Sequence, residues 1–161
     1  PESQRPRKLG QAISADEILS LAGDVNRGRA IFDKSSAAQC KKCHAVQGFG
    51  GSLGPELTKI GNKYERKALL ETIVEPSKAI APEFVPYLLE TTGGQVHAGF
   101  IVDRNADQVT LKDVNSKLIR VPAAEVAEVA PQQKSLMPEL VLSEVSAQDA
   151  ADLLAYLMTL K

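Results

Sequence analysis

Aromatic side chains are scarce in this sequence: Phe, Trp and Tyr make up 4% of its 161 residues, and Trp is absent. Hydrophobic residues still make up 43%. We therefore expect a globular core of aliphatic side chains, in which a bound planar group would supply apolar bulk that aromatic residues do not. No apolar run approaches the ~20 residues of a membrane helix. We expect no membrane span in this chain and no nucleic-acid partner.

Cysteine and histidine are also scarce, with two residues of each. Both cysteines lie in Cys40-Lys41-Lys42-Cys43-His44, a C-x-x-C-H pentapeptide. Two thiols at this spacing on one helical turn match the separation of the two vinyl groups of a haem, and the next residue directs its imidazole at the iron. The motif predicts one covalently bound haem c, attached through Cys40 and Cys43, with His44 as an axial ligand.

A C-x-x-C pair has two other common uses, in zinc sites and in dithiol redox motifs. A zinc site needs a second pair of ligands, but the chain has no further cysteine and only His97 besides His44. A dithiol redox motif follows a β-strand, whereas residues 35–40 show no apolar strand pattern. Since the haem motif uses both cysteines, no disulfide is predicted.

The location of haem attachment gives an expectation about the protein's compartment. Residues 1–8 are polar and basic and do not form a signal peptide. Thioether formation to haem takes place outside the cytoplasm, so we expect a periplasmic or otherwise exported protein. We interpret the chain as a fragment of a larger one.

Charge is unevenly distributed along the chain. Residues 1–80 hold 13 Lys and Arg against 9 Asp and Glu, and residues 81–161 hold 6 against 11. A basic surface near the motif would steer an acidic redox partner toward the haem, and a merely solvated surface is the alternative. The candidate docking residues are Lys41, Lys42, Lys59, Lys63, Arg66 and Lys67.

Capping signals and apolar spacing predict four helices. Ser14-Ala15-Asp16-Glu17 has the form of a capping box, in which Glu17 would reach back to the Ser14 N–H. Asp24 and Ser146 are the caps expected for the second and last helices, and Pro76 stops the third. The first predicted helix runs from Ser14 toward Leu21, and the last runs from Ser146 to Leu160. The second begins at Val25, and its expected apolar face consists of Val25, Gly28, Ile31 and Phe32. The third covers 63–74, with Ala68, Leu69, Ile73 and Val74 apolar.

Between the third and last helices the pattern changes to short β-branched runs separated by turn residues. The predicted strands are 85–91, 96–102, 109–112, 118–121 and 126–129. Pro86 places the first strand at an edge or makes its start irregular. We expect an antiparallel insertion of SH3-like or Sm-like size in a mainly α protein, which is α+β overall. The domains expected are a tail at 1–13, a haem domain at 14–81 with 131–161, and a β-rich insertion at 82–130.

Residues after the motif supply candidates for the proximal side of the haem. A ligating imidazole commonly donates its other ring N–H to a backbone carbonyl, which fixes the ring and raises its basicity. The Pro55 carbonyl, in Gly54-Pro55-Glu56-Leu57, is our candidate acceptor. We expect Leu57 to pack on the haem face.

A sixth ligand is needed if the iron is to stay six-coordinate in both oxidation states. Met137, in a loop before Pro138, is our candidate. Met158 lies on the apolar face of the last helix and is better explained as core. The competitor is His97 in the second predicted strand, where alternation places Val96, Ala98 and Phe100 on one face and the imidazole on the other.

These elements resemble a class I cytochrome c. The resemblance lies in Gly28-x-x-x-Phe32, the C-x-x-C-H motif, Gly54-Pro-x-Leu57, the late Met-Pro and Leu153-x-x-Tyr156-Leu157. In that family the first and last helices cross. The resemblance implies that Gly28 and Phe32 contact Leu153 and Tyr156, and that His44 and Met137 are the proximal and distal ligands.

The sequence is similar in more detail to the planctomycete-type haem-binding domain family. The shared features are Gly50-Gly51, Gly54 to Thr58, Pro76-Ser77, the β-rich insertion, Ser135 to Pro138 and Asp152 to Leu157. Such domains resemble C-terminal modules of large exported dehydrogenase-like proteins. The resemblance implies a redox partner protein or a fused dehydrogenase domain.

We therefore predict an electron-transfer protein and not an enzyme, because no paired titratable groups indicate turnover chemistry. One alternative is an open iron position that binds peroxide or a diatomic gas. The other is an interaction module in which residues 82–130 dock a partner domain.

Overall fold

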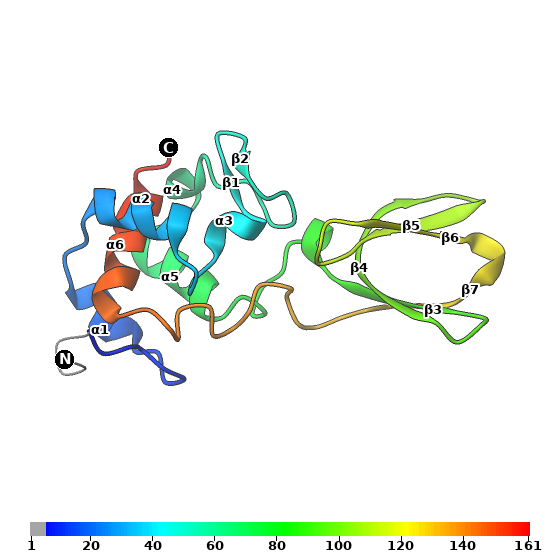
Figure 1. Cartoon of the computed structure of the whole chain (residues 1–161), viewed down its shortest axis with the longest axis horizontal. Coiled ribbons are helices and arrows are strands. Elements are labelled where there is room, and N and C mark those ends of the chain that lie inside the picture. Colours follow the sequence, from blue (N-terminus) through cyan, green and yellow to red (C-terminus); the bar gives the residue numbers. More distant parts are fainter. Residues whose placement is uncertain (1–5) are drawn as a thin grey trace. The chain divides into compact units, whose positions relative to one another are not determined.

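The computed structural model of this chain describes residues 6–161, which fall into two compact units (Figure 1). Within the described residues, the helical unit comprises 6–76 and Pro138–Lys161, and the β unit comprises Ser77–Met137. No helix within the described residues is both long and apolar enough to cross a membrane. The helical unit contains α1 (Ala15–Ser20), α2 (Val25–Lys34), α3 (Cys40–Cys43), β1 (Ala45–Val46), β2 (Phe49–Gly50), α4 (Ile60–Lys63), α5 (Arg66–Val74) and α6 (Ala147–Met158).

The β unit is larger than the insertion expected at 82–130. Its first and last segments are joined by the Ser135 N–H, which donates to the Ser77 hydroxyl at 3.1 Å. The Gln132 N–H also donates to the Pro86 carbonyl, at 2.8 Å. The residues that precede the first strand and follow the last strand in the sequence are therefore part of the β unit, and Met137 is its last residue.

Three helices begin at the caps that the sequence predicts. Asp24 accepts from the Arg27 N–H at 2.8 Å, and Ser146 and Asp149 form a reciprocal capping box. Ser14 accepts from the Glu17 N–H, but the reciprocal bond expected from Glu17 is replaced: its carboxylate pairs with Arg7 at 2.9 Å. An exposed arginine therefore competes successfully for the carboxylate.

The stretch expected as a tail at 1–13 is bound to the helical unit over its described part. The Leu9 N–H donates to Val145 O at 2.9 Å, and the Gly10 N–H donates to Ser143 O at 2.8 Å. The remainder of that prediction, residues 1–5, lies outside the described residues.

Helices α2 and α6 cross at very short range. A Cβ atom added to Gly28 would lie 1.9 Å from the Asp152 carbonyl oxygen, so no larger residue fits without a shift. The Phe32 and Tyr156 rings pack one turn away, with centroids 5.8 Å apart. The contacts expected of Gly28 and Phe32 with Tyr156 are present, and Leu153 is buried. Val25 was expected on the apolar face of α2, but its side chain is 41% exposed, so this part of the prediction is wrong.

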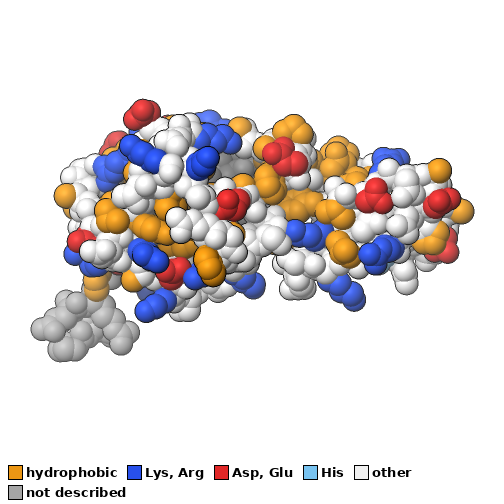
Figure 2. Space-filling view, turned by 90° about the horizontal axis from the view of Figure 1, so that it is seen from above, with side chains coloured by type: hydrophobic (Ala, Val, Ile, Leu, Met, Phe, Trp, Pro, Cys, Tyr) orange, Lys and Arg blue, Asp and Glu red, His pale blue; other side chains and the backbone are white. Residues whose placement is uncertain are grey.

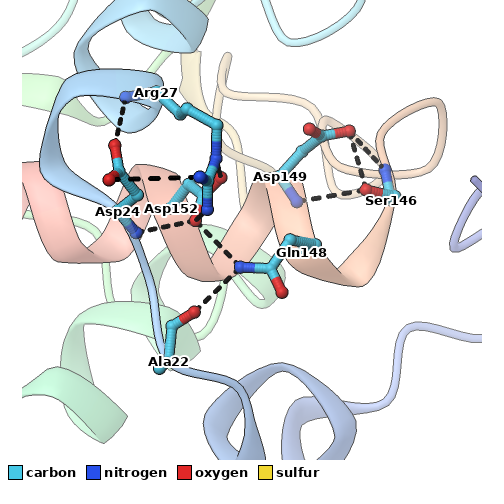
Figure 3. Close-up of polar contacts among 7 residues, drawn as sticks. All are labelled: Ala22, Asp24, Arg27, Ser146, Gln148, Asp149 and Asp152. Atoms are coloured by element: carbon cyan, nitrogen blue, oxygen red, sulfur yellow. Dashed lines mark hydrogen bonds and ion pairs between the residues drawn. The ribbon is translucent and has the colours of Figure 1, made fainter.

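A polar network lies beside this crossing (Figure 3). The Asp152 carboxylate, 1% exposed, accepts from the Asp24 N–H at 2.7 Å and from Gln148 Nε2 at 2.9 Å. It also accepts from Arg27 Nε at 2.6 Å and from Nη2 at 3.0 Å. Burial raises the pKa of the Asp152 carboxyl, but the hydrogen bonds from Arg27, Asp24 and Gln148 outweigh burial, and the net pKa is lowered.

The helix expected over 63–74 is present as α5 but begins later, at Arg66; Lys63 instead ends the separate turn α4, and extended backbone at Tyr64 and Glu65 divides the two. The Gly61 N–H binds the Leu160 carbonyl at 2.7 Å, which fixes α4 at the end of α6. Arg66, the first residue of α5, donates to the carbonyls that end α1. These two anchors explain the break. The residues that α5 buries are Leu69, Leu70 and Ile73.

The β unit contains the five predicted strands in a different pairing from a simple meander. The sheet order is β6-β5-β4-β3-β7, so the last strand returns to pair with the first, and all pairs are antiparallel. The edge position expected from Pro86 is therefore wrong: β3 is an inner strand, and it begins at Tyr87, directly after the proline. Leu89, Val109, Leu111 and Val121 form its core. The elements are β3 (Tyr87–Thr91), β4 (Val96–Arg104), β5 (Gln108–Lys112), β6 (Leu118–Pro122), β7 (Val126–Pro131) and the short 3₁₀ helices η2 (Pro82–Phe84) and η3 (Ala123–Glu125).

The alternation expected along β4 does not divide its residues into buried and exposed. Val96 is 60% exposed, whereas Phe100, at the same phase, is 7% exposed. Phe84 in η2 explains the difference, since its ring meets Phe100 edge-on at 5.9 Å. Helix η2 thus covers the Phe100 end of this face of the sheet, while the Val96 end stays exposed to solvent. The alternation of a strand does not predict such a cover.

Replacing Phe32 by Ala should lower the free energy of unfolding by about 3–5 kcal/mol, because it empties the α2–α6 crossing. Val25→Ala on the same helix is the exposed control and should cost less than about 1 kcal/mol. Urea unfolding measures both. A loss below ~1 kcal/mol for Phe32→Ala would remove this contact from the core of the fold.

Replacing Asp152 by Asn should lower the free energy of unfolding at neutral pH by about 1.5–3 kcal/mol, the range for hydrogen bonds to charged groups. The folded pKa lies below the unfolded value of ~3.9. The carboxylate's contribution is therefore present above that value and is lost as pH falls through the folded pKa. Urea unfolding over an acid pH series should show the difference shrinking; a constant difference would contradict the network.

Candidate functional site

The C-x-x-C-H residues form one tight helical turn. Helix α3 is this single turn, and the His44 N–H closes it by donating to Cys40 O at 2.9 Å. Gln39 precedes it in the left-handed region, at φ 51°. Both cysteines are free thiols and half-buried. The turn therefore holds the two sulfur atoms on one short element, directly before the imidazole.

The Cys40 thiol is not activated. Burial, opposed by a backbone hydrogen bond and aided by the neighbouring Cys43, raises its pKa to about 11. Reactive dithiols and zinc sites use thiolates of low pKa. Among residues 6–161, no group of three or more His, Cys, Asp and Glu side chains is placed to hold a metal ion. The thioredoxin-like and zinc alternatives gain no support.

The His44 ring is fixed by the backbone of the following loop. Its Nδ1 lies 2.8 Å from the Pro55 carbonyl oxygen, the contact expected from the sequence. Because a carbonyl only accepts, Nδ1 carries the proton and Nε2 presents a lone pair. Burial lowers the pKa of His44, and the Pro55 hydrogen bond opposes this in part. The imidazole is thus neutral near pH 7, in the tautomer that binds a metal through Nε2.

Two glycines allow the loop to pass close to this turn. A Cβ atom added to Gly54 would lie 2.6 Å from Cε1 of His44, and one added to Gly51 would lie 1.9 Å from Lys42 O. The Gly54 N–H also donates to Cys43 O at 2.8 Å. The absence of side chains at these positions is therefore what lets the imidazole occupy its place.

The sequence analysis missed a small hairpin between His44 and this loop. Strands β1 and β2 pair through Ala45 with Gly50 and Val46 with Phe49. The two residues between them, Gln47 and Gly48, have φ values of 52° and 78°. Positive φ at both central positions is typical of a type I′ hairpin turn. The Gln-Gly pair between two apolar residues was the available signal, but strands of two residues are too short to show a period.

The hairpin is joined to the loop that carries Pro55. The Leu57 N–H donates to Ala45 O at 2.8 Å, and Leu57 is buried at 9% exposure. Leu57 therefore lies next to the residue that follows His44. Its packing on the haem face stays a prediction.

The side chains of the C-x-x-C-H turn have the chemistry that binding of a haem c requires. Two thiols lie on one helical turn, and a neutral imidazole with a bound Nδ1–H follows them. Gly54 leaves the space beside the imidazole that a side chain would fill. Cys40, Cys43, His44, Pro55 and Leu57 all lie together in the helical unit.

The two candidates for the sixth ligand lie in the β unit. Met137 is half-buried, and its N–H donates to the Ser135 hydroxyl at 3.1 Å. His97 lies within β4, opposite the core residue Leu89 of β3, and is half-buried. Met158 is a half-buried residue at the end of α6.

Half of the candidate docking cations have structural partners. Lys41 pairs with Asp33 at 2.8 Å, the Lys63 amine lies 5.2 Å from the Tyr64 ring centroid, and Arg66 binds the end of α1. On the face seen in Figure 2, basic side chains are scattered among uncharged and acidic ones. Docking through Lys42, Lys59 and Lys67 stays a prediction.

Comparison with known proteins gives two matches. The family model described as Cytochrome c matches residues 25–113, more than half of the chain, including the C-x-x-C-H turn. A cytochrome c-553-like protein of Synechocystis sp. is 33% identical over 70 residues. That match covers 44% of this chain and 62% of the relative's length.

Replacing Gly54 by Ala should displace the His44 ring, because the new Cβ would lie 2.6 Å from Cε1. We expect a lower yield of covalently attached haem and a lower thermal midpoint, measured by pyridine haemochrome assay and thermal unfolding. Gly93→Ala is the control, since the nearest atom to its new Cβ would be Thr91 Oγ1, at an ordinary contact distance of 3.8 Å. Equal haem yields for the two variants would show that the close approach does not matter.

Proposed function

The chain belongs to the cytochrome c family, and from this premise we propose that it carries one electron at a time between redox partners, with its haem iron bound by His44 and Met137. Membership of the family implies a covalently bound haem c, for which Cys40 and Cys43 fit the attachment motif. A bound haem supplies reversible one-electron chemistry at its iron. The family indicates an electron-transfer protein rather than a catalytic enzyme.

The observation that carries this proposal is the hydrogen bond from His44 Nδ1 to the Pro55 carbonyl. It holds the imidazole in one tautomer, leaves a lone pair on Nε2 and raises the basicity of the ring. Cys40 and Cys43 would hold a bound haem beside this residue. A ligand fixed in this way needs little rearrangement when the electron arrives or leaves.

Met137 is proposed as the second axial ligand on its chemistry and its place in the chain. A thioether stabilises the ferrous iron and raises the potential, as an electron carrier of the His/Met type requires. Met137 follows the sheet in a loop, with its backbone fixed by Ser135. His97 is held within strand β4, where it pairs with Leu89 of β3, and is therefore the weaker candidate.

We also infer an SH3-like arrangement for the β unit. The strand order β6-β5-β4-β3-β7 and the short helix η3 between β6 and β7 support it. Docking of a redox partner or of a fused dehydrogenase domain is its proposed role. Export, and membership of the planctomycete-type group within the larger family, are proposed on the haem motif and the sequence resemblance.

Optical spectra of the haem-loaded protein test the ligation. We expect a low-spin ferric spectrum with the weak red charge-transfer band of a sulfur ligand, which Met137→Ala abolishes. Met158→Leu is the matched control and should keep the band.

A different spectrum would contradict the proposal in one of two ways. A high-spin spectrum would show an open iron position and favour ligand binding. A low-spin spectrum without the sulfur band, altered by His97→Ala, would assign the site to nitrogen instead.

A further inference from the structure

A second set of contacts holds the Pro55 loop, beyond those of the proposed haem site. The Thr58 hydroxyl accepts from the Gln47 N–H at 2.6 Å and donates to the Glu56 carboxylate. That hydroxyl lowers the pKa of Glu56, and the backbone N–H groups of Thr58, Gln47 and Gly48 lower it as well, against a smaller opposing effect of burial. An exposed carboxylate is thus held as an anion at the hairpin turn.

Together with two contacts of the haem site, the Thr58 contact makes three successive hydrogen bonds between residues 44–47 and residues 55–58. The His44 ring binds Pro55 O, Ala45 O accepts from the Leu57 N–H, and the Gln47 N–H donates to Thr58. The first contact fixes the imidazole. The third lies at the far end, where nothing in the haem site requires it.

The hairpin turn needs such a contact. Gln47 adopts a left-handed conformation, at φ 52°, which is unfavourable for a non-glycine residue. Its N–H is bound by Thr58 in this conformation. The loop and the turn therefore stabilise each other, and a change in one should reach the other.

We propose that Thr58 and Glu56 are positioning residues that hold the Gln47-Gly48 turn against the Pro55 loop and so set the hydrogen bond from His44 to Pro55. This inference rests on the proposed function, in that His44 must bind the iron. A firm hydrogen bond at Nδ1 raises imidazole basicity and favours ferric iron, so loosening it should raise the midpoint potential.

The test uses the haem-loaded protein and four variants. Thr58→Val removes the hydroxyl without a change of charge, and Thr58→Ser restores it. Glu56→Gln removes the anion, and Glu71→Gln, an exposed carboxylate on α5, controls for the loss of one negative charge. The readouts are the midpoint potential and the hydrogen-exchange rate of the His44 Nδ1–H, followed by NMR in the ferrous state.

We expect exchange to be about tenfold faster in Thr58→Val, the factor for loss of roughly one hydrogen bond, together with a higher potential. Glu56→Gln should change both readouts in the same direction, while Thr58→Ser and Glu71→Gln stay near the parent. If Thr58→Val fails to fold, the inference is tested by comparing Glu56→Gln with Glu71→Gln. Only Glu56→Gln should then raise the potential and the exchange rate of the His44 Nδ1–H.

Unchanged exchange and potential in Thr58→Val and Glu56→Gln would overturn the inference, even if thermal stability fell, because the pair would then be merely structural. Failure of the proposed function looks different. In that case His44→Ala would leave the ligation spectrum of the iron unaltered, whatever the Thr58 variants do.

Discussion

The crossing of α2 and α6 is the contact on which the helical unit depends. Gly28 lets the two backbones approach to a distance that any Cβ would prevent, and Phe32 fills the next turn against Tyr156. Asp152 adds a buried carboxylate that accepts from α2 and from its cap. Because α2 leads directly to the cysteine turn, this crossing fixes where the haem motif begins.

From that turn onward, the site is built from backbone groups more than from side chains. The imidazole of His44 is held by the carbonyl of Pro55, and the hairpin after it is held by Leu57 and Thr58. Gly54 and Gly51 give the loop room to approach. The result is an imidazole whose position is set by short-range hydrogen bonds within about fifteen residues of chain.

Much of this arrangement could be predicted from the sequence, because caps, strand runs and the haem motif are local signals. Ser146, Asp24 and the Pro55 acceptor were all expected. The remainder depends on contacts between distant residues: Phe84 covers Phe100, and β7 returns to β3. The hairpin after His44 was missed because it is too short to show a period. The ligation by Met137 stays a proposal, since no local signal decides it.

One-electron voltammetry of the haem-loaded protein, with and without carbon monoxide, tests the electron-carrier role most directly. We expect a reversible couple that carbon monoxide leaves unchanged, because in the proposed ligation His44 and Met137 would hold both axial positions in each oxidation state. A couple that shifts under carbon monoxide, or a reduction that is irreversible, would contradict this role and show an iron open to external ligands.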